Sequence, residues 1–142
     1  LHPKTNFELF GAIDDLWING KDEYIVVDYK ATAKDEAVKA LDKEWQDGYK
    51  RQMEVYQWLL RQNGLKVSDV GYFVYCTGKM DRQAFDKKIE FDVNLIEHRG
   101  DDSWVEKTLK EIKKCLDGKK IPASGPDCDY CAYRRAVAEV ER

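Results

Sequence analysis

Alternating apolar and polar positions near the start of the chain predict two β-strands joined by a tight turn. The alternation runs over residues 7–18 and again over residues 24–31. Asn19 and Gly20 stand between the two runs, and an Asn-Gly pair in this position is typical of hairpin turns. The pattern therefore predicts an antiparallel hairpin.

The register of this hairpin decides which side chains meet. A hairpin centred on Lys21 places Asp14 opposite Asp28. Because side chains alternate across a strand, Lys30 lies on the same face as Asp28. Apolar side chains fill most of the other positions on both faces of the pair. This predicts two interior strands of a sheet that is covered on both sides.

A charged segment and a helix are predicted to follow the hairpin. Residues 32–47 combine many charged side chains with a few apolar ones, which indicates a helical or irregular crossover with a solvated surface. Apolar positions at helical spacing predict a helix over about 45–62, ended by Gly64. This crossover leads the chain back to the sheet.

Two further strands and a second helix complete the predicted fold. A run of β-branched and aromatic residues predicts a buried strand at 67–77, and a weaker alternation predicts an outer strand at 85–93. We expect His98 in a loop, followed by capping residues at 101–103 and an apolar helical stripe that ends at Gly118. The order of elements predicts an α/β fold with a mixed sheet flanked by helices.

Composition and charge narrow the class of protein. With 142 residues, 43% of them hydrophobic and 36% charged, the chain fits one soluble domain over 1–142, whose C-terminal segment is about 119–142. The net charge of −3 gives no overall attraction to nucleic acid, so such binding requires a local basic surface. No apolar run approaches the roughly 20 residues of a membrane helix, and no secretory leader is visible. Few, irregularly spaced cysteines favour the cytoplasm.

The facing acids of the hairpin suggest a site that binds a metal ion. Two carboxylates opposite one another repel unless a divalent cation bridges them. With Lys30 alongside, Asp14 and Asp28 form a set that suits metal-assisted phosphodiester hydrolysis, in which the ion activates water and the amine orients it. An alternative stays open from the residues alone: Asp14 or Asp15 caps a bulge, and Asp28 pairs with Lys30 in a surface salt bridge.

Three motifs in order resemble those of the PD-(D/E)xK nuclease superfamily, in its RecB-like branch. They are G-x-I-D at 11–14, V-V-D-Y-K at 26–30 and Q-x-x-x-Y at 52–56. The resemblance implies a restriction-endonuclease-like fold and a site that binds Mg²⁺ or Mn²⁺. It implies Asp14, Asp28 and the backbone carbonyl of Tyr29 as metal ligands.

The resemblance also implies a set of catalytic residues. These are Asp14, Asp28, Lys30 as the catalytic amine, and Gln52 and Tyr56 lining the site near the substrate backbone. From the residues alone, Gln52 and Tyr56 are a hydrogen-bonded pair on a core-facing helix. In the family, a helix before the hairpin adds an acid or histidine. That helix has no counterpart in this sequence, and His2, before Pro3 in an extended segment, is a weak substitute.

The cysteines suggest a second metal site. Cys128 and Cys131 form a C-x-x-C pair, which is half of a tetrahedral thiolate site. The resemblance implies an iron–sulfur cluster here, but the cysteine expected shortly after the pair is absent. Cys115 is the candidate third ligand of such a cluster or of zinc. Free thiols are the favoured interpretation, with Cys76 a small buried hydrophobe.

Together these features favour a Mg²⁺- or Mn²⁺-dependent, exonuclease-like deoxyribonuclease in DNA repair, recombination, or phage or CRISPR defence. The implied partners are a DNA single strand or duplex end and a larger nuclease–helicase or CRISPR assembly. Candidate DNA-holding residues are Lys50, Arg51, Arg134 and Arg135. Two other functions stay open: a catalytically incomplete nucleic-acid-binding or interaction domain of the same fold, and a thiolate module for zinc or an iron–sulfur cluster.

Overall fold

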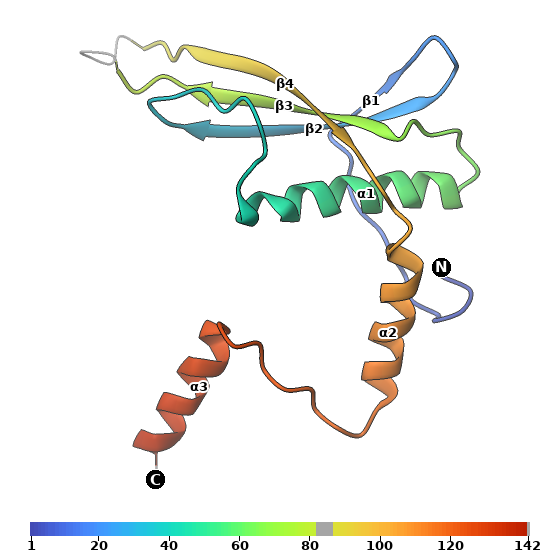
Figure 1. Ribbon diagram of the computed structural model, residues 1–142, viewed down its shortest axis with the longest axis vertical. Helices are drawn as coiled ribbons and strands as arrows, with labels where there is room; N and C mark the ends of the chain where they lie inside the picture. The colour runs from blue at the N-terminus through green and yellow to red at the C-terminus, as the bar shows by residue number, and fades with distance from the viewer. Residues whose placement is uncertain (82–86, 142) are drawn as a thin grey trace.

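The computed structural model describes residues 1–81 and 87–141, and its centre is a four-stranded mixed sheet (Figure 1). The strands lie in the order β1-β2-β3-β4, with the middle pair parallel and the two outer pairs antiparallel. Their bounds are Asp15–Ile18 for β1, Tyr24–Ala33 for β2, Val70–Gly78 for β3 and Phe91–Arg99 for β4. The predicted mixed sheet is confirmed.

The helices connect and extend this sheet. Their bounds are Glu44–Gln46 for the 3₁₀ turn η1, Asp47–Gln62 for α1, Val105–Asp117 for α2 and Asp129–Val140 for α3. Parallel strands require a crossover, and α1 supplies it between β2 and β3, lying along one face of the sheet. The architecture agrees with the predicted α/β, restriction-endonuclease-like fold. Among the described residues, no helix is long and apolar enough to cross a membrane.

The main core lies between α1 and the sheet. It is formed by side chains that alternate along the strands and by one face of α1. Its buried members are Val26, Leu41, Met53, Phe73, Tyr75 and Ile96. A smaller core joins α1 to α2 through Trp58, Val105 and Leu109. The helix α3 contributes to neither core, because it buries none of its residues, and it lies apart in Figure 1.

The sheet is covered by a helix on one face only, contrary to the predicted double cover. Figure 1 shows α1 below the sheet and no described helix above it. On that open face, Tyr29 is 49% exposed and Leu95 is 56% exposed. Moreover, β1 is an edge strand, so the prediction of two interior strands is wrong for it. Val27 is nevertheless fully buried.

Two strand predictions need correction. The first strand begins at Asp15 rather than at residue 7, because the Asp14 carboxylate, not its backbone, accepts the Tyr29 N–H. The outer strand expected at 85–93 is Phe91–Arg99 instead, while residues 82–86 lie outside the described part. His98 is therefore a strand residue, not a loop residue, and its Nε2 contacts Glu54 Oε1 of α1 at 3.0 Å.

The helix predictions hold with smaller differences. The crossover is irregular except for η1, and α1 ends just before Gly64, which has a positive φ of 80°. α2 ends at Gly118 as expected, but its N-cap is Trp104, which makes no side-chain cap. Only the first half of its apolar stripe is buried, since Ile112 and Leu116 are exposed.

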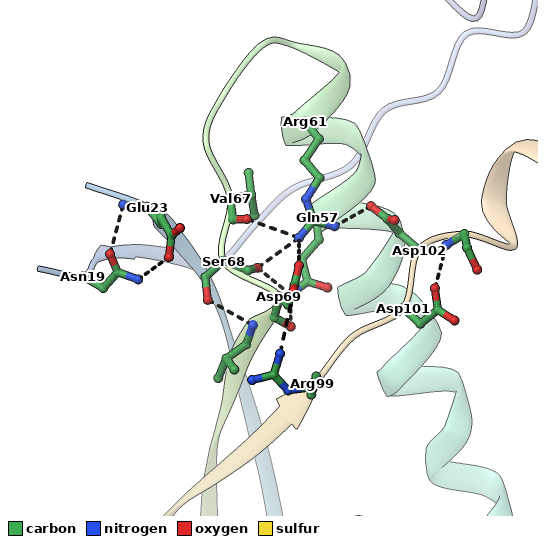
Figure 2. A network of polar contacts seen from close by, with 12 residues as sticks. Asn19, Glu23, Gln57, Arg61, Val67, Ser68, Asp69, Arg99, Asp101 and Asp102 are labelled. Carbon is green, nitrogen blue, oxygen red and sulfur yellow. Dashed lines mark hydrogen bonds and ion pairs between the residues drawn. The ribbon is translucent and has the colours of Figure 1, made fainter. Parts of the chain in front are cut away.

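A polar network fixes the C-terminal half of α1 (Figure 2). Arg61 donates hydrogen bonds to Asp102 at 2.6 Å and to Asp69 at 2.8 Å, which joins α1 to the segments before α2 and β3. One turn earlier, Gln57 Nε2 donates to the backbone carbonyls of Ser68 (3.2 Å) and Asp69 (3.0 Å). Since Gln57 is fully buried, these bonds set the position of α1 along the sheet.

The N-terminal turn is attached to α2 through Glu106. His2 is buried, with Nδ1 2.6 Å from Thr5 Oγ1 and Nε2 2.7 Å from Glu106 Oε2. Lys4 donates to the other oxygen of Glu106 at 2.8 Å. One nitrogen of His2 therefore has its partner in this turn and the other in α2, and neither contacts Asp14 or Asp28.

We expect Glu106→Gln to lower stability at neutral pH and to have little effect in strong acid. Hydrogen bonds from Lys4 and His2 lower the pKa of Glu106 from 4.5 to about 2. A carboxyl with a depressed folded-state pKa contributes stability above its unfolded pKa, and this contribution is lost as the pH falls from about 4.5 to about 2. Thermal unfolding of both proteins at pH 7 and pH 2 checks this. An equal difference at both pH values would contradict it.

Candidate active site

The observed pairing of β1 with β2 ends one residue short of the two predicted acids. β1 pairs Asp15 with Val27 and Leu16 with Val26, and the same register continued by one residue places Asp14 opposite Asp28. Asp14 is exposed just outside β1, whereas Asp28 is only 4% exposed inside β2. Asp14 is therefore the solvated acid and Asp28 the buried one.

The side chains of Asp14 and Asp15 have different hydrogen-bond partners and lie on different faces of the sheet. Asp14 Oδ2 accepts the backbone N–H of Tyr29 at 2.8 Å. Asp15 Oδ2 instead accepts hydrogen bonds from Trp17 Nε1 and from the Tyr29 hydroxyl, both at 3.0 Å, on the open face of the sheet. The bonds from Trp17 and Tyr29 lower the pKa of Asp15. Of the two neighbouring acids, Asp14 is therefore the one on the side of Asp28.

Lys30 points at the buried acid. Its ammonium forms an ion pair with Asp28 Oδ2, and the lysine side chain is 17% exposed. That carboxylate oxygen makes no hydrogen bond within the described residues, so Lys30 is its one recorded polar partner. The same ammonium lies 3.4 Å from Gln52 Oε1. The predicted amine and buried carboxylate are thus in contact.

Two predicted residues of α1 extend this cluster. Gln52 Nε2 donates to the Tyr56 hydroxyl at 2.9 Å, as their spacing of one helical turn allows. Gly11 packs directly on the Tyr56 ring, because a Cβ at Gly11 would lie 2.5 Å from a ring carbon. The three sequence motifs therefore meet in space through Lys30, Gln52 and Tyr56.

Tyr49 is a further member of the cluster that the motifs did not include. Its ring centroid lies 4.6 Å from the Lys30 ammonium, within the range of a cation–π interaction. A signal was present in the sequence, since Tyr49 precedes Gln52 by three residues and so shares its helix face. Gln52 and Tyr49 together hold the amine beside Asp28.

The oxygen donors of this cluster fit a hard divalent cation. Mg²⁺ commonly binds through one or two carboxylates and completes its shell with waters and substrate phosphates. Asp14 and Asp28 are the predicted pair, and the buried Oδ2 of Asp28 already contacts the Lys30 ammonium. Across residues 1–81 and 87–141, no group of three or more His, Cys, Asp or Glu side chains could hold a metal. The predicted protein donors stay two carboxylates, Asp14 and Asp28, and the backbone carbonyl of Tyr29.

The cysteines do not gather around one point. All four are free thiols, and Cys115 is exposed on α2. Cys128 and Cys131 lie at the start of α3, where a hydrogen bond between the two thiols lowers the pKa of Cys128 and raises that of Cys131. Cys115 does not join them in a metal-binding group within the described chain. Their role as ligands stays a prediction.

The predicted DNA-holding residues are not part of the cluster's recorded contacts. Lys50 forms an ion pair with Asp47 at 2.9 Å, and Arg51 is exposed on α1. Arg134 and Arg135 are exposed on α3. Two of the four therefore lie on α1, the helix that carries Gln52 and Tyr56, and two lie on α3, which buries none of its residues.

One of three comparisons with known proteins identifies a family for the chain. The family model described as the PD-(D/E)XK nuclease superfamily matches residues 3–136, nearly the whole chain. Searches of curated proteins and of solved structures gave no matching relative. The match includes the facing acids, the lysine and the helix that carries Gln52 and Tyr56. The chain belongs to the PD-(D/E)XK nuclease superfamily.

Proposed function

We propose that this chain is a Mg²⁺- or Mn²⁺-dependent deoxyribonuclease of the RecB-like branch that hydrolyses phosphodiester bonds at a DNA single strand or duplex end. One observation carries the proposal: the Lys30 ammonium contacts the buried Asp28 carboxylate, next to the position opposite Asp14. An amine held against a buried carboxylate suits metal-assisted phosphodiester hydrolysis, because the acid can bind a cation and the amine can meet the charge on the phosphate. Repair, recombination or defence against phage is the setting that the proposed branch implies.

In this proposal Asp14, Asp28 and the carbonyl of Tyr29 bind the cation. A cation in such a site supplies a bound water of lowered pKa and positive charge against the phosphate. Asp28 also keeps the Lys30 ammonium in place through their ion pair. Because Asp28 is buried, this pair is shielded from solvent, which strengthens the attraction between the two charges.

Lys30 and the residues of α1 act on the substrate. The Lys30 ammonium orients the attacking water and donates a hydrogen bond to the negative charge that develops on the phosphate oxygens. Gln52 and Tyr56 contact the sugar–phosphate backbone and hold the scissile phosphate in position. Gln52 serves both partners, since its oxygen faces Lys30 and its amide nitrogen faces Tyr56.

Cleavage of labelled linear DNA tests the proposal. We expect the wild-type protein to degrade single-stranded or duplex DNA in Mg²⁺ or Mn²⁺, to be inactive in EDTA, and to lose activity by about a hundredfold or more in Lys30→Ala. Folding of the variant is checked by circular dichroism. If the wild-type protein cleaves DNA neither with Mg²⁺ nor with Mn²⁺, the proposal is overturned.

A catalytically incomplete binding domain of the same fold is the second candidate. It is favoured by the small number of acids, because the described residues offer two carboxylates and no group of three. This candidate predicts that the protein binds DNA but does not cleave it with any metal ion. The cleavage assay, together with a measurement of DNA binding, separates it from the leading proposal.

We expect Tyr49→Leu to lower the cleavage rate by roughly tenfold, whereas Tyr49→Phe retains most of it. The ring face attracts the Lys30 ammonium, an interaction worth about 0.5–2 kcal/mol, and phenylalanine keeps that face. The comparison uses initial rates at saturating DNA. Equal loss in both variants would mean that the hydroxyl or the packing matters and not the ring face.

A further inference from the structure

Positive charge is concentrated along α2 in a chain that is acidic overall. Residues 104–120 together with Lys4 hold seven lysines and three acids, a net charge of +4. Since the whole chain has a net charge of −3, the remainder has −7. A polyanion approaching this protein is therefore attracted more strongly to α2 than to the remainder of the chain taken as a whole.

The basic residues occupy one side of the helix. Lys107, Lys110 and Lys114 follow one another at spacings of three and four residues, and Lys113 lies beside them. The apolar stripe of α2 faces a different way, with Val105 and Leu109 buried against α1. The lysine face is thus separate from the packed face of the helix.

The N-terminal turn adds a fixed lysine to this face. Figure 1 shows the N-terminal segment beside α2, and Glu106 joins the two by accepting from Lys4 at 2.8 Å and lying 2.7 Å from His2. Lys110 approaches the same carboxylate at 3.2 Å. A single acid therefore gathers two lysines that are distant in sequence, which fixes the ammonium groups before any ligand arrives.

A groove lies between this turn and the helix. Its volume is about 560 Å³, and it is lined by Lys4, Thr5, Lys110, Lys113, Lys114, Asp117 and Gly118. Asp117, the one acid of the lining, pairs with Lys113 at 2.7 Å. Lys114 has no recorded ion pair among the described residues and is exposed. The groove offers a net positive, partly unneutralised surface.

We propose that the groove between the N-terminal turn and α2 binds the phosphate backbone of the nucleic-acid substrate without regard to sequence. This inference rests on the proposed function. Lysines make point contacts with phosphates and carry no base information. A nucleic acid is favoured over an anionic membrane because the superfamily requires a nucleic-acid substrate and because the exposed apolar residues Ile112 and Leu116 do not line the groove.

Binding of a fluorescent 30-nucleotide single strand in EDTA tests the proposal without chemistry. We expect Lys110→Gln/Lys114→Gln to weaken binding about tenfold and to reduce the slope of log K against log salt by about 1.4, since each lost phosphate contact removes roughly 0.7. The arginine pair Lys110→Arg/Lys114→Arg should bind like the wild type. The matched control is Lys87→Gln/Lys88→Gln, two exposed residues before β4 with the same change in charge.

Equal binding by the wild type and the α2 glutamine variant would overturn the inference, as would equal weakening in the control, because the effect would then be one of net charge. Preference of the wild type for anionic phosphatidylserine vesicles over the oligonucleotide would also overturn it. If the wild type cleaves DNA while the α2 variant binds normally, the inference fails and the proposed function stands. If the wild type binds through α2 but cleaves nothing with Mg²⁺ or Mn²⁺, the proposed function fails instead.

Discussion

Asp14→Asn should lower the rate of DNA cleavage by about a hundredfold or more, whereas Asp15→Asn should leave it close to the wild-type rate. Even residues that only support metal ligands cost roughly 10–100-fold when replaced, so loss of a ligand should cost at least as much. The two positions are adjacent and the charge change is the same. They differ in face: Asp14 lies opposite Asp28, while Asp15 binds Trp17 and Tyr29 on the open face.

The comparison is made with initial rates on linear DNA over a range of Mg²⁺ and Mn²⁺ concentrations. Both variants are checked for folding by thermal unfolding, because Asp15 has hydrogen bonds that asparagine only partly replaces. If the Asp15 variant loses as much activity as the Asp14 variant, the assignment of the two faces is wrong.

Gly71→Val should destabilise the fold by about 3 kcal/mol through overpacking beneath α1. A Cβ at Gly71 would lie 2.3 Å from the sulfur of Met53 and 3.0 Å from the backbone oxygen of Val26. The flexible methionine can shift, but the strand carbonyl cannot. Met53 follows Gln52 in α1, so lifting the helix also moves the candidate site. Chemical denaturation measures the change in the free energy of unfolding.

Gly48→Ala is the matched control for this prediction. Nothing lies within 4 Å of a Cβ at Gly48, which is in the first turn of α1. Alanine has the higher helix propensity, so stability should be kept or rise by up to about 1 kcal/mol. Similar losses in both variants would show that close packing at Gly71 is not the cause.

The site could be predicted from sequence where local rules determine it. Alternation along the two strands indicated the hairpin register, and the observed pairing of Asp15 with Val27 is the register that centres on Lys21. The turn itself spans residues 19–23, and its residue with positive φ is Asp22 rather than Gly20. The hydrogen bond between Gln52 and Tyr56 follows from helical spacing, whereas their place in the site came from the family resemblance. The contact between Lys30 and Gln52 could not be predicted from local spacing, because it depends on how α1 crosses the sheet.

The remaining features depend on tertiary packing that no local pattern reports. Periodicity does not say that β1 lies at a sheet edge or that one face stays without a helix. In the sequence, His98 looks like a loop residue because Arg99 and Gly100 follow it. In the structure it belongs to β4, and its ring contacts Glu54 of α1. Tyr49 has the spacing of a core residue, and only its distance to the Lys30 ammonium indicates a role.

Titration of Mn²⁺ into the wild-type protein, Asp14→Asn and Asp15→Asn, followed by calorimetry, tests the metal site most directly, because it needs neither substrate nor turnover. We predict that the wild type and Asp15→Asn bind the ion with similar affinity and that Asp14→Asn binds it at least tenfold more weakly. Equal affinity of all three proteins, or no binding by the wild type, would contradict a cation held between the facing acids.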